Sequence, residues 1–210
     1  EAARKRAEAE DHAARQRERA ISQGRGFWMR GLDAEGTVVE AYLKARTGAR
    51  TLPGGIWENI RYLPSHGYKH GLDDRGYEKE IHCGPAMVAP MVDLNGHVTG
   101  CHQTWIDMDR PPKYRPLLVE ERVDKDGKDH QEILPTKKMR GHKKGSIIPI
   151  LGGLEADRWM VGEGIETVLT LAAVEQFRAD TFYAAAGDLG NIAGPADPRS
   201  AFDHPTLKKQ

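Results

Sequence analysis

The sequence has only two cysteines, Cys83 and Cys101, among 210 residues, so no disulfide framework holds the fold together. This sparing use of cysteine fits a reducing compartment, and we expect a cytoplasmic protein. No stretch approaches the roughly 20 apolar residues that a transmembrane helix requires. The first residues also lack the charged and then apolar pattern of a signal peptide. We therefore expect no membrane attachment.

The sequence also lacks net charge, because 31 Lys and Arg residues balance 31 Asp and Glu residues. Any affinity for nucleic acid must therefore come from local basic patches. The first residue is Glu1 and not Met, and no structural element is completed at Lys208-Lys209-Gln210. We interpret the chain as a piece of a longer polypeptide.

Helix and strand signals are clear in the first half of the chain. Residues 1–20 are rich in Ala, Glu and Arg with opposite charges three and four positions apart, which predicts a solvated surface helix or a helical linker. A second helix is predicted over 36–46, where apolar residues form one stripe. The segments 86–92 and 97–106 flank a turn at 93–96 and predict a β-hairpin.

The second half changes character along its length. Residues 108–145 are polar and rich in Pro, Lys and Gly, so we expect loops there, followed by a short strand over 147–150. A buried strand is then predicted over 158–161, an apolar helix over 165–177 and a second strand over 181–186. Strand, helix and strand over about 30 residues predict a βαβ unit with parallel strands.

These patterns predict an α/β protein in consecutive parts. Residues 1–20 form a charged helical linker, and residues 21–153 form a mixed α+β subdomain. Residues 154–210 are expected to form a Rossmann-like subdomain around a parallel sheet.

The sequence Gly162-Glu163-Gly164 places a carboxylate where the first strand of the βαβ unit ends and its helix begins. Ligands bind at this carboxyl edge in open α/β sheets. The two glycines are expected to turn the backbone sharply and to leave room for a ligand beside Glu163. Glu163 could then hold a hard cation or act as a general base.

Other interpretations of this segment remain open. A dinucleotide fingerprint would need a third glycine where Thr167 stands, and Glu163 would repel a pyrophosphate. A P-loop is excluded because no Gly-Lys-Ser/Thr follows. In the simplest alternative, Glu163 and Glu166 only favour the helix N-terminus through its dipole.

Glu163-Gly164 between an apolar strand and an apolar helix, with a second strand ending at Ala185-Ala186-Gly187, resembles the toprim domain of primases, topoisomerases and certain nucleases. Three upstream segments resemble, in the same order, toprim primases of phages and mobile elements of proteobacteria. They are Pro85–Pro90, the strand Gly100–Thr104 with His102, and the basic stretch Lys137–Gly145.

This resemblance covers roughly residues 35–195 and implies synthesis of short RNA primers on single-stranded DNA from nucleoside triphosphates, with Mg²⁺ or Mn²⁺. It makes Glu163 the catalytic and metal-binding glutamate and Gly164 its turn partner. Such primases commonly work with a replicative helicase. The family's second acidic motif, Asp-x-Asp on a later strand, is not found, because Asp107-Met108-Asp109 precedes Glu163 and is expected to form a turn. We expect Asp188 to cap a helix or to support the metal site.

A basic run precedes Gly145 and contains five Lys and Arg residues among eight. Such a patch binds phosphates independently of sequence, and in a toprim primase it would face the incoming nucleotide or the template. The alternative is a solvated charge run. The five residues are Lys137, Lys138, Arg140, Lys143 and Lys144.

Two pairs, His82-Cys83 and Cys101-His102, could meet across neighbouring strands and bind zinc, although a packed strand interior fits them as well. His102 and Thr104 share one face of their strand, where either a structural role or a substrate contact is possible.

Residues 154–210 would be the front part of a toprim domain. Two other functions remain open. A toprim nuclease would use the same glutamate and metal ions to cleave DNA. A non-catalytic DNA-binding module of a mobile element's replication complex would need neither.

Overall fold

The computed structural model describes residues 1–123 and 126–193. Its helices and strands confirm an α/β protein in which most strand pairs are antiparallel. No helix in this described part is long and apolar enough to cross a membrane. The end of the expected toprim part, from residue 194 onward, lies outside the described residues.

The elements of the first half are α1 (Ala2–Met29), β1 (Leu32–Asp33), α2 (Val38–Thr47), the 3₁₀ helix η1 (Gly54–Glu58), β2 (Arg61–Leu72), β3 (Glu78–Val92) and β4 (Val98–Trp105). Those of the second half are β5 (Leu118–Val123), β6 (Asp129–Leu134), β7 (Lys137–Gly141), β8 (Ile148–Leu151), β9 (Arg158–Gly162), α3 (Ile165–Val174), β10 (Thr181–Ala185) and α4 (Leu189–Ala193).

The larger sheet has five strands in the order β1-β2-β3-β4-β7, and all of its pairs are antiparallel. The expected hairpin is confirmed as β3 and β4. Its turn is closed by Asp93, whose Oδ1 accepts hydrogen bonds from the backbone N–H groups of Asn95 and His97, both at 2.9 Å. Alternation along β4 points Cys101 and Gln103 to one face of the sheet and His102 to the other.

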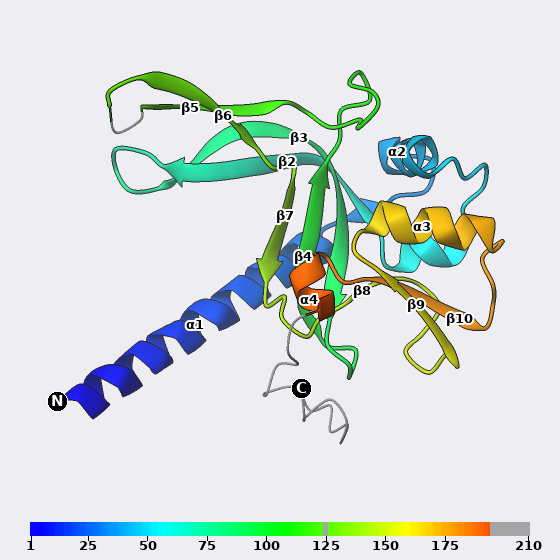
Figure 1. Cartoon of the computed structure of the whole chain (residues 1–210), viewed down its shortest axis with the longest axis horizontal. Coiled ribbons are helices and arrows are strands. Elements are labelled where there is room, and N and C mark those ends of the chain that lie inside the picture. The colour runs from blue at the N-terminus through cyan, green and yellow to red at the C-terminus, as the bar shows by residue number, and fades with distance from the viewer. Residues whose placement is uncertain (124–125, 194–210) are drawn as a thin grey trace.

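Helix α1 crosses the first of these faces (Figure 1). It continues nine residues past the predicted end at residue 20, because Phe27 and Trp28 pack on the sheet beside Leu63 and Val88. Gly24 allows the close approach, since a Cβ there would lie 2.1 Å from the carbonyl oxygen of Arg140. The helix therefore serves as more than a linker, although its exposed first 19 residues fit the expected solvated helix.

The expected βαβ unit is confirmed as β9, α3 and β10, with β9 and β10 parallel. The sheet around it is not wholly parallel, however. Its three strands follow the order β8-β10-β9, and β8 pairs antiparallel with β10. The third strand is thus the short apolar segment predicted over 147–150, which runs antiparallel to the two strands of the βαβ unit.

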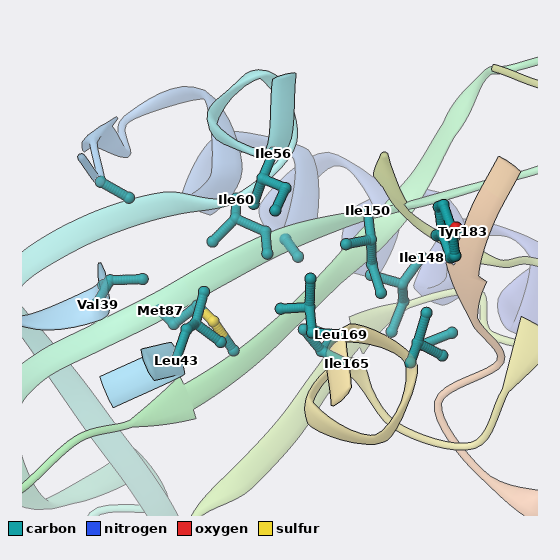
Figure 2. Close-up of a cluster of buried hydrophobic side chains, with 14 of the residues drawn as sticks. Val39, Leu43, Ile56, Ile60, Met87, Ile148, Ile150, Ile165, Leu169 and Tyr183 are labelled. Atoms are coloured by element: carbon teal, nitrogen blue, oxygen red, sulfur yellow. The ribbon is translucent and has the colours of Figure 1, made fainter. Parts of the chain in front are cut away.

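One hydrophobic core joins the parts of the chain on either side of residue 153. Figure 2 shows Leu43 of α2 and Met87 of β3 in the same cluster as Ile148 of β8, Leu169 of α3 and Tyr183 of β10. Burial of such side chains stabilises a fold by roughly 1.5–3 kcal/mol each. This core holds β4, β7 and the start of α3 in fixed positions relative to one another.

The polar region 108–145 contains more regular structure than its sequence predicts. Strands β5 and β6 form a separate antiparallel pair, and β7 joins the large sheet. The loop expected around residues 124–127 falls partly outside the described residues. The β5–β6 pair was missed because it is built from charges, with Arg122 of β5 lying 2.9 Å from Glu132 of β6.

Candidate active-site pocket

A pocket of about 250 Å³ opens where β9 ends and α3 begins. It lies between the βαβ unit and the face of the large sheet that points away from α1. Side chains of both signs line it, with an excess of cations. The lining residues are Arg46, His102, Arg115, Lys137, Ile148, Glu163, Gly164, Ile165, Glu166, Thr167 and Gly187.

Glu163 stands at the mouth of this pocket with an exposed side chain. Its backbone is fixed by the two residues that follow β10, because the carbonyl oxygens of Gly162 and Glu163 accept hydrogen bonds from the backbone N–H groups of Ala186 and Gly187, both at 2.8 Å. No residue in the described part forms an ion pair with its carboxylate. Glu163 is therefore exposed at the rim of a pocket that Arg46, Arg115 and Lys137 also line.

The chain bends at Glu163 and Gly164 as expected, but the bend does not depend on a left-handed glycine. Neither Gly162 nor Gly164 adopts a left-handed backbone, and Gly164 has an extended conformation with φ −125° and ψ 156°. Gly162 is required by packing, since a Cβ there would lie 2.8 Å from Cγ2 of Val168. A Cβ on Gly164 would only reach an ordinary contact, 3.7 Å from a carboxylate oxygen of Glu166. The glycine with a left-handed backbone in this part of the pocket is Gly187, with φ +87°.

Glu166 is a buried hub and does not merely favour the helix dipole. Its Oε2 accepts a hydrogen bond from Lys137 Nζ at 2.7 Å, and its Oε1 accepts one from Arg115 Nη2 at 2.7 Å. Tyr42 donates its hydroxyl to Oε1 at 2.5 Å and accepts from Arg115 Nε at 2.9 Å. The hub joins four parts of the fold around one carboxylate: helix α2, the segment that precedes β5, strand β7 and helix α3.

Burial and the charges within the hub shift the pKa values of its residues strongly. Burial alone would raise the pKa of Glu166, but the Lys137 ammonium, the Tyr42 hydroxyl and Arg115 outweigh it and lower the pKa to about 2. Burial lowers the pKa of Lys137, and the charge of Glu166 opposes that effect. Burial also raises the pKa of Tyr42, so this residue acts as a neutral donor. Glu166 is therefore ionised, and both of its oxygens are committed to protein partners.

The basic run predicted as one patch is divided between two faces of β7. Lys137 pairs across from Thr104 and points into the pocket, whereas Lys138, opposite Gln103, points toward α1. Arg140 also faces α1, and its guanidinium donates to Gln23 of that helix. A period of two along a strand makes this division unavoidable.

The two remaining lysines lie beyond β7 in the loop before β8. Lys143 forms an ion pair with Asp188, and Lys144 is exposed. Asp188 also accepts from the backbone N–H of Asn191 at 2.8 Å, which confirms the expected capping of α4. The turn expected at Asp107 is confirmed as well, since its Oδ1 accepts from the backbone N–H of Asp109 at 3.1 Å.

A second, larger pocket of about 450 Å³ lies under α1 on the opposite face of the sheet. Its floor contains His66, which stacks on Trp105 at 5.0 Å between ring centroids and hydrogen-bonds Gln103 at 2.6 Å. Lys138 extends over this floor with its ammonium 3.8 Å from the centre of the Tyr68 ring. This pocket is called the α1 groove below.

The two Cys-His pairs do not form a zinc site. His102 pairs with Ala89 on β3, which is seven positions from His82, or roughly 20 Å along the strand. Within residues 1–123 and 126–193, no three His, Cys, Asp or Glu side chains are grouped to hold a metal ion. Cys101 is buried in the sheet, as the packed-interior alternative expected.

Two pocket residues, Arg46 and Arg115, and one residue of the Glu166 hub, Tyr42, were not predicted as site residues from the sequence. Tyr42 belongs to the apolar stripe of the helix predicted over 36–46, and Arg46 is the last residue of that predicted helix. Arg115 lies in the polar region over 108–145, where only loops were expected. No local pattern signals these positions, because the pocket gathers residues from α2 and α3 that lie more than a hundred positions apart.

Comparison with known proteins gives one family match. The model of a domain of unknown function (DUF7146) matches residues 18–150, and this segment carries Arg46, His102, Arg115 and Lys137 of the pocket. Glu163 follows the matched segment. No curated protein and no solved structure matches the chain. Because the match covers more than half of the sequence, the chain belongs to the DUF7146 family.

Proposed function

We propose that this chain carries part of the active site of a toprim-type DNA primase, an enzyme that joins nucleotides into short primers on single-stranded DNA. One observation carries the proposal: the free carboxylate of Glu163 shares a pocket with three cationic side chains at the start of α3. The cations are Arg46, Arg115 and Lys137. A reactive acid beside clustered phosphate-binding groups is the arrangement that phosphoryl transfer requires.

The cations would bind the phosphates of an incoming nucleoside triphosphate. The contacts with Glu166 and Tyr42 use one donor of Lys137 and two of Arg115, whereas an ammonium has three donors and a guanidinium has five. The first N–H groups of α3 add to this surface, since Gly164 provides no side-chain cap. Glu166 holds the two cations in place and so prepares the pocket before the nucleotide arrives.

Glu163 would accept the proton of the attacking 3′-hydroxyl, and its carboxylate also suits Mg²⁺ or Mn²⁺. In the described residues it is not part of any group of three or more His, Cys, Asp or Glu side chains that could hold a metal ion. Mg²⁺ in nucleotide-binding enzymes is often held by one or two carboxylates together with substrate phosphates, so Glu163 fits as one such ligand. A bound divalent ion would neutralise charge that develops on the phosphates.

The α1 groove would bind the template strand. Lys138 and Arg140 supply positive charge there, and Phe27 and His66 supply aromatic surface, a combination that suits single-stranded nucleic acid. The template and nucleotide sites would then lie on opposite faces of β7, with alternate residues of one strand serving each.

The test is incubation of the full-length protein with single-stranded DNA, labelled ribonucleotides and Mn²⁺, followed by separation of the products by size. A primase yields new labelled oligonucleotides. A toprim nuclease instead shortens the DNA, and a binding module does neither. Either of the last two results would remove the proposal.

A further inference from the structure

His102 of β4 lies on the wall of the active-site pocket and is almost completely enclosed, with 4% of its surface exposed. Its ring nitrogen Nδ1 is buried and has no hydrogen-bond partner among the described residues. A buried polar atom without a partner is uncommon in native proteins and is costly to keep. The strand itself does not require a histidine at this position, since an apolar residue would fill the same space.

The imidazole is uncharged in its surroundings. Burial is the main cause, and the nearby Lys137 and Arg115 cations add to it, so the pKa of His102 falls to about 3. A neutral imidazole presents one N–H donor and one nitrogen acceptor. His102 can therefore give a hydrogen bond to a ligand without adding a further positive charge to the pocket.

The surrounding groups define what that ligand is. Arg46, Arg115 and Lys137 bring positive charge to the pocket, and the uncapped start of α3 adds backbone N–H groups. A ligand that satisfies these groups carries several negatively charged oxygens. The group most suited to meet His102 is therefore a phosphate oxygen, which accepts the N–H.

We propose that His102 is a ligand-binding residue that donates a hydrogen bond from an uncharged imidazole to a phosphate oxygen held in the pocket. That the phosphate belongs to a nucleoside triphosphate rests on the function proposed above. The hydrogen bond itself rests on the place of His102 in the pocket wall, the absence of a partner for its ring among the described residues, and the cations around it.

The test measures binding of inorganic pyrophosphate to the full-length protein by calorimetry. We compare the wild type with His102→Leu, which removes the polar nitrogens, and with His102→Asn, whose amide can replace Nδ1. Thr104→Val is the matched control, because Thr104 Oγ1 is also buried without a partner on the same face of β4 but does not line the pocket.

We expect His102→Leu to weaken pyrophosphate binding about tenfold, His102→Asn to stay within about threefold of the wild type, and Thr104→Val to leave binding unchanged. The melting temperature of His102→Leu should be equal to or above that of the wild type, since an unpartnered polar atom is replaced by an apolar one. A structural histidine would instead give lower stability with unchanged binding, and that result would overturn the inference.

Primer synthesis by the same preparations separates this inference from the proposed function. If pyrophosphate binding depends on His102 but the protein makes no primers, the phosphate-binding role of His102 is supported and the proposed primase function is refuted. If His102→Leu makes primers with an unchanged KM for the nucleotide, the proposed primase function is supported and the role of His102 is refuted. A wild-type protein that does not bind pyrophosphate would also overturn the inference.

Discussion

Lys137 and Glu166 form a partly buried ion pair, with 2.7 Å between Nζ and Oε2, that joins the large sheet to the first turn of α3. The side chain of Glu166 is 8% exposed and that of Lys137 is 28% exposed. The pair therefore lies where solvent screening is weak, and Arg115 extends it to a second cation. This contact connects the part of the chain that matches the DUF7146 family with the helix that follows Glu163.

Glu166→Gln should destabilise the protein because it leaves the partly buried cations of Lys137 and Arg115 without the charge of Glu166. Removal of one partner from a buried ion pair costs on the order of 3 kcal/mol. Thermal unfolding at pH 7 measures the effect. The double variant Lys137→Met/Glu166→Leu is the control, and it should be more stable than Glu166→Gln; a less stable double variant would contradict the buried-charge argument.

Stability should also fall in acid through Glu166. The pKa of this carboxyl is lowered from 4.5 to about 2 in the folded protein. A group with a lowered folded pKa contributes stability that is complete above its unfolded pKa and is lost as the pH falls toward the folded value. Denaturant unfolding of the wild type between pH 5 and pH 2.5 should show this loss, and Glu166→Gln should show a shallower dependence on pH. If the free energy of unfolding changed equally with pH in the wild type and in Glu166→Gln, Glu166 would not be ionised in the hub.

Gly162 and Gly164 should respond differently to alanine. Gly162→Ala forces a methyl group against Val168 and should lower the free energy of unfolding by about 1–3 kcal/mol. Gly164→Ala meets nothing closer than 3.7 Å and should cost less than about 1 kcal/mol. Chemical denaturation of both variants checks the difference, and equal effects would mean that packing on α3 is not the reason for Gly162.

The division of the basic run between two faces predicts separable defects. Lys138→Ala/Arg140→Ala should weaken binding of single-stranded DNA and reduce the slope of log K against log salt by roughly 0.7 for each lost phosphate contact. Lys137→Ala should instead weaken pyrophosphate binding and leave the salt slope for DNA unchanged. Lys5→Ala, on the exposed part of α1, is the control for general charge loss. Equal loss of DNA binding in all three variants would show that the α1 groove has no special role.

Local sequence patterns predicted much of the framework. The β3–β4 hairpin, helix α2 and the β9–α3–β10 unit follow from hydrophobic periodicity and turn residues such as Asp93 and Gly96. Strands β5, β6 and β7 were missed because charged residues such as Arg122 and Lys138 occupy them, and tertiary pairing overrides their weak strand signal.

The candidate site was predictable only in part. Glu163 could be found because it directly follows an apolar strand and precedes an apolar helix. Arg46 and Arg115 of the pocket and Tyr42 of the hub could not be found, because α2 and the segment before β5 reach α3 only through tertiary packing. The basic run was recognised by composition, but which lysine faces which side depends on strand pairing that the composition does not encode.

The most direct test of the central claim is primer synthesis by Glu163→Gln on single-stranded DNA with ribonucleotides and Mn²⁺. Glu18→Gln, an exposed glutamate of α1, serves as the matched control. Removal of a general base slows the chemical step by about a hundredfold or more, so we expect kcat of Glu163→Gln to fall at least that far. Its pyrophosphate binding and its melting temperature should stay close to those of the wild type and of Glu18→Gln. Primer synthesis at the wild-type rate in Glu163→Gln would contradict the account.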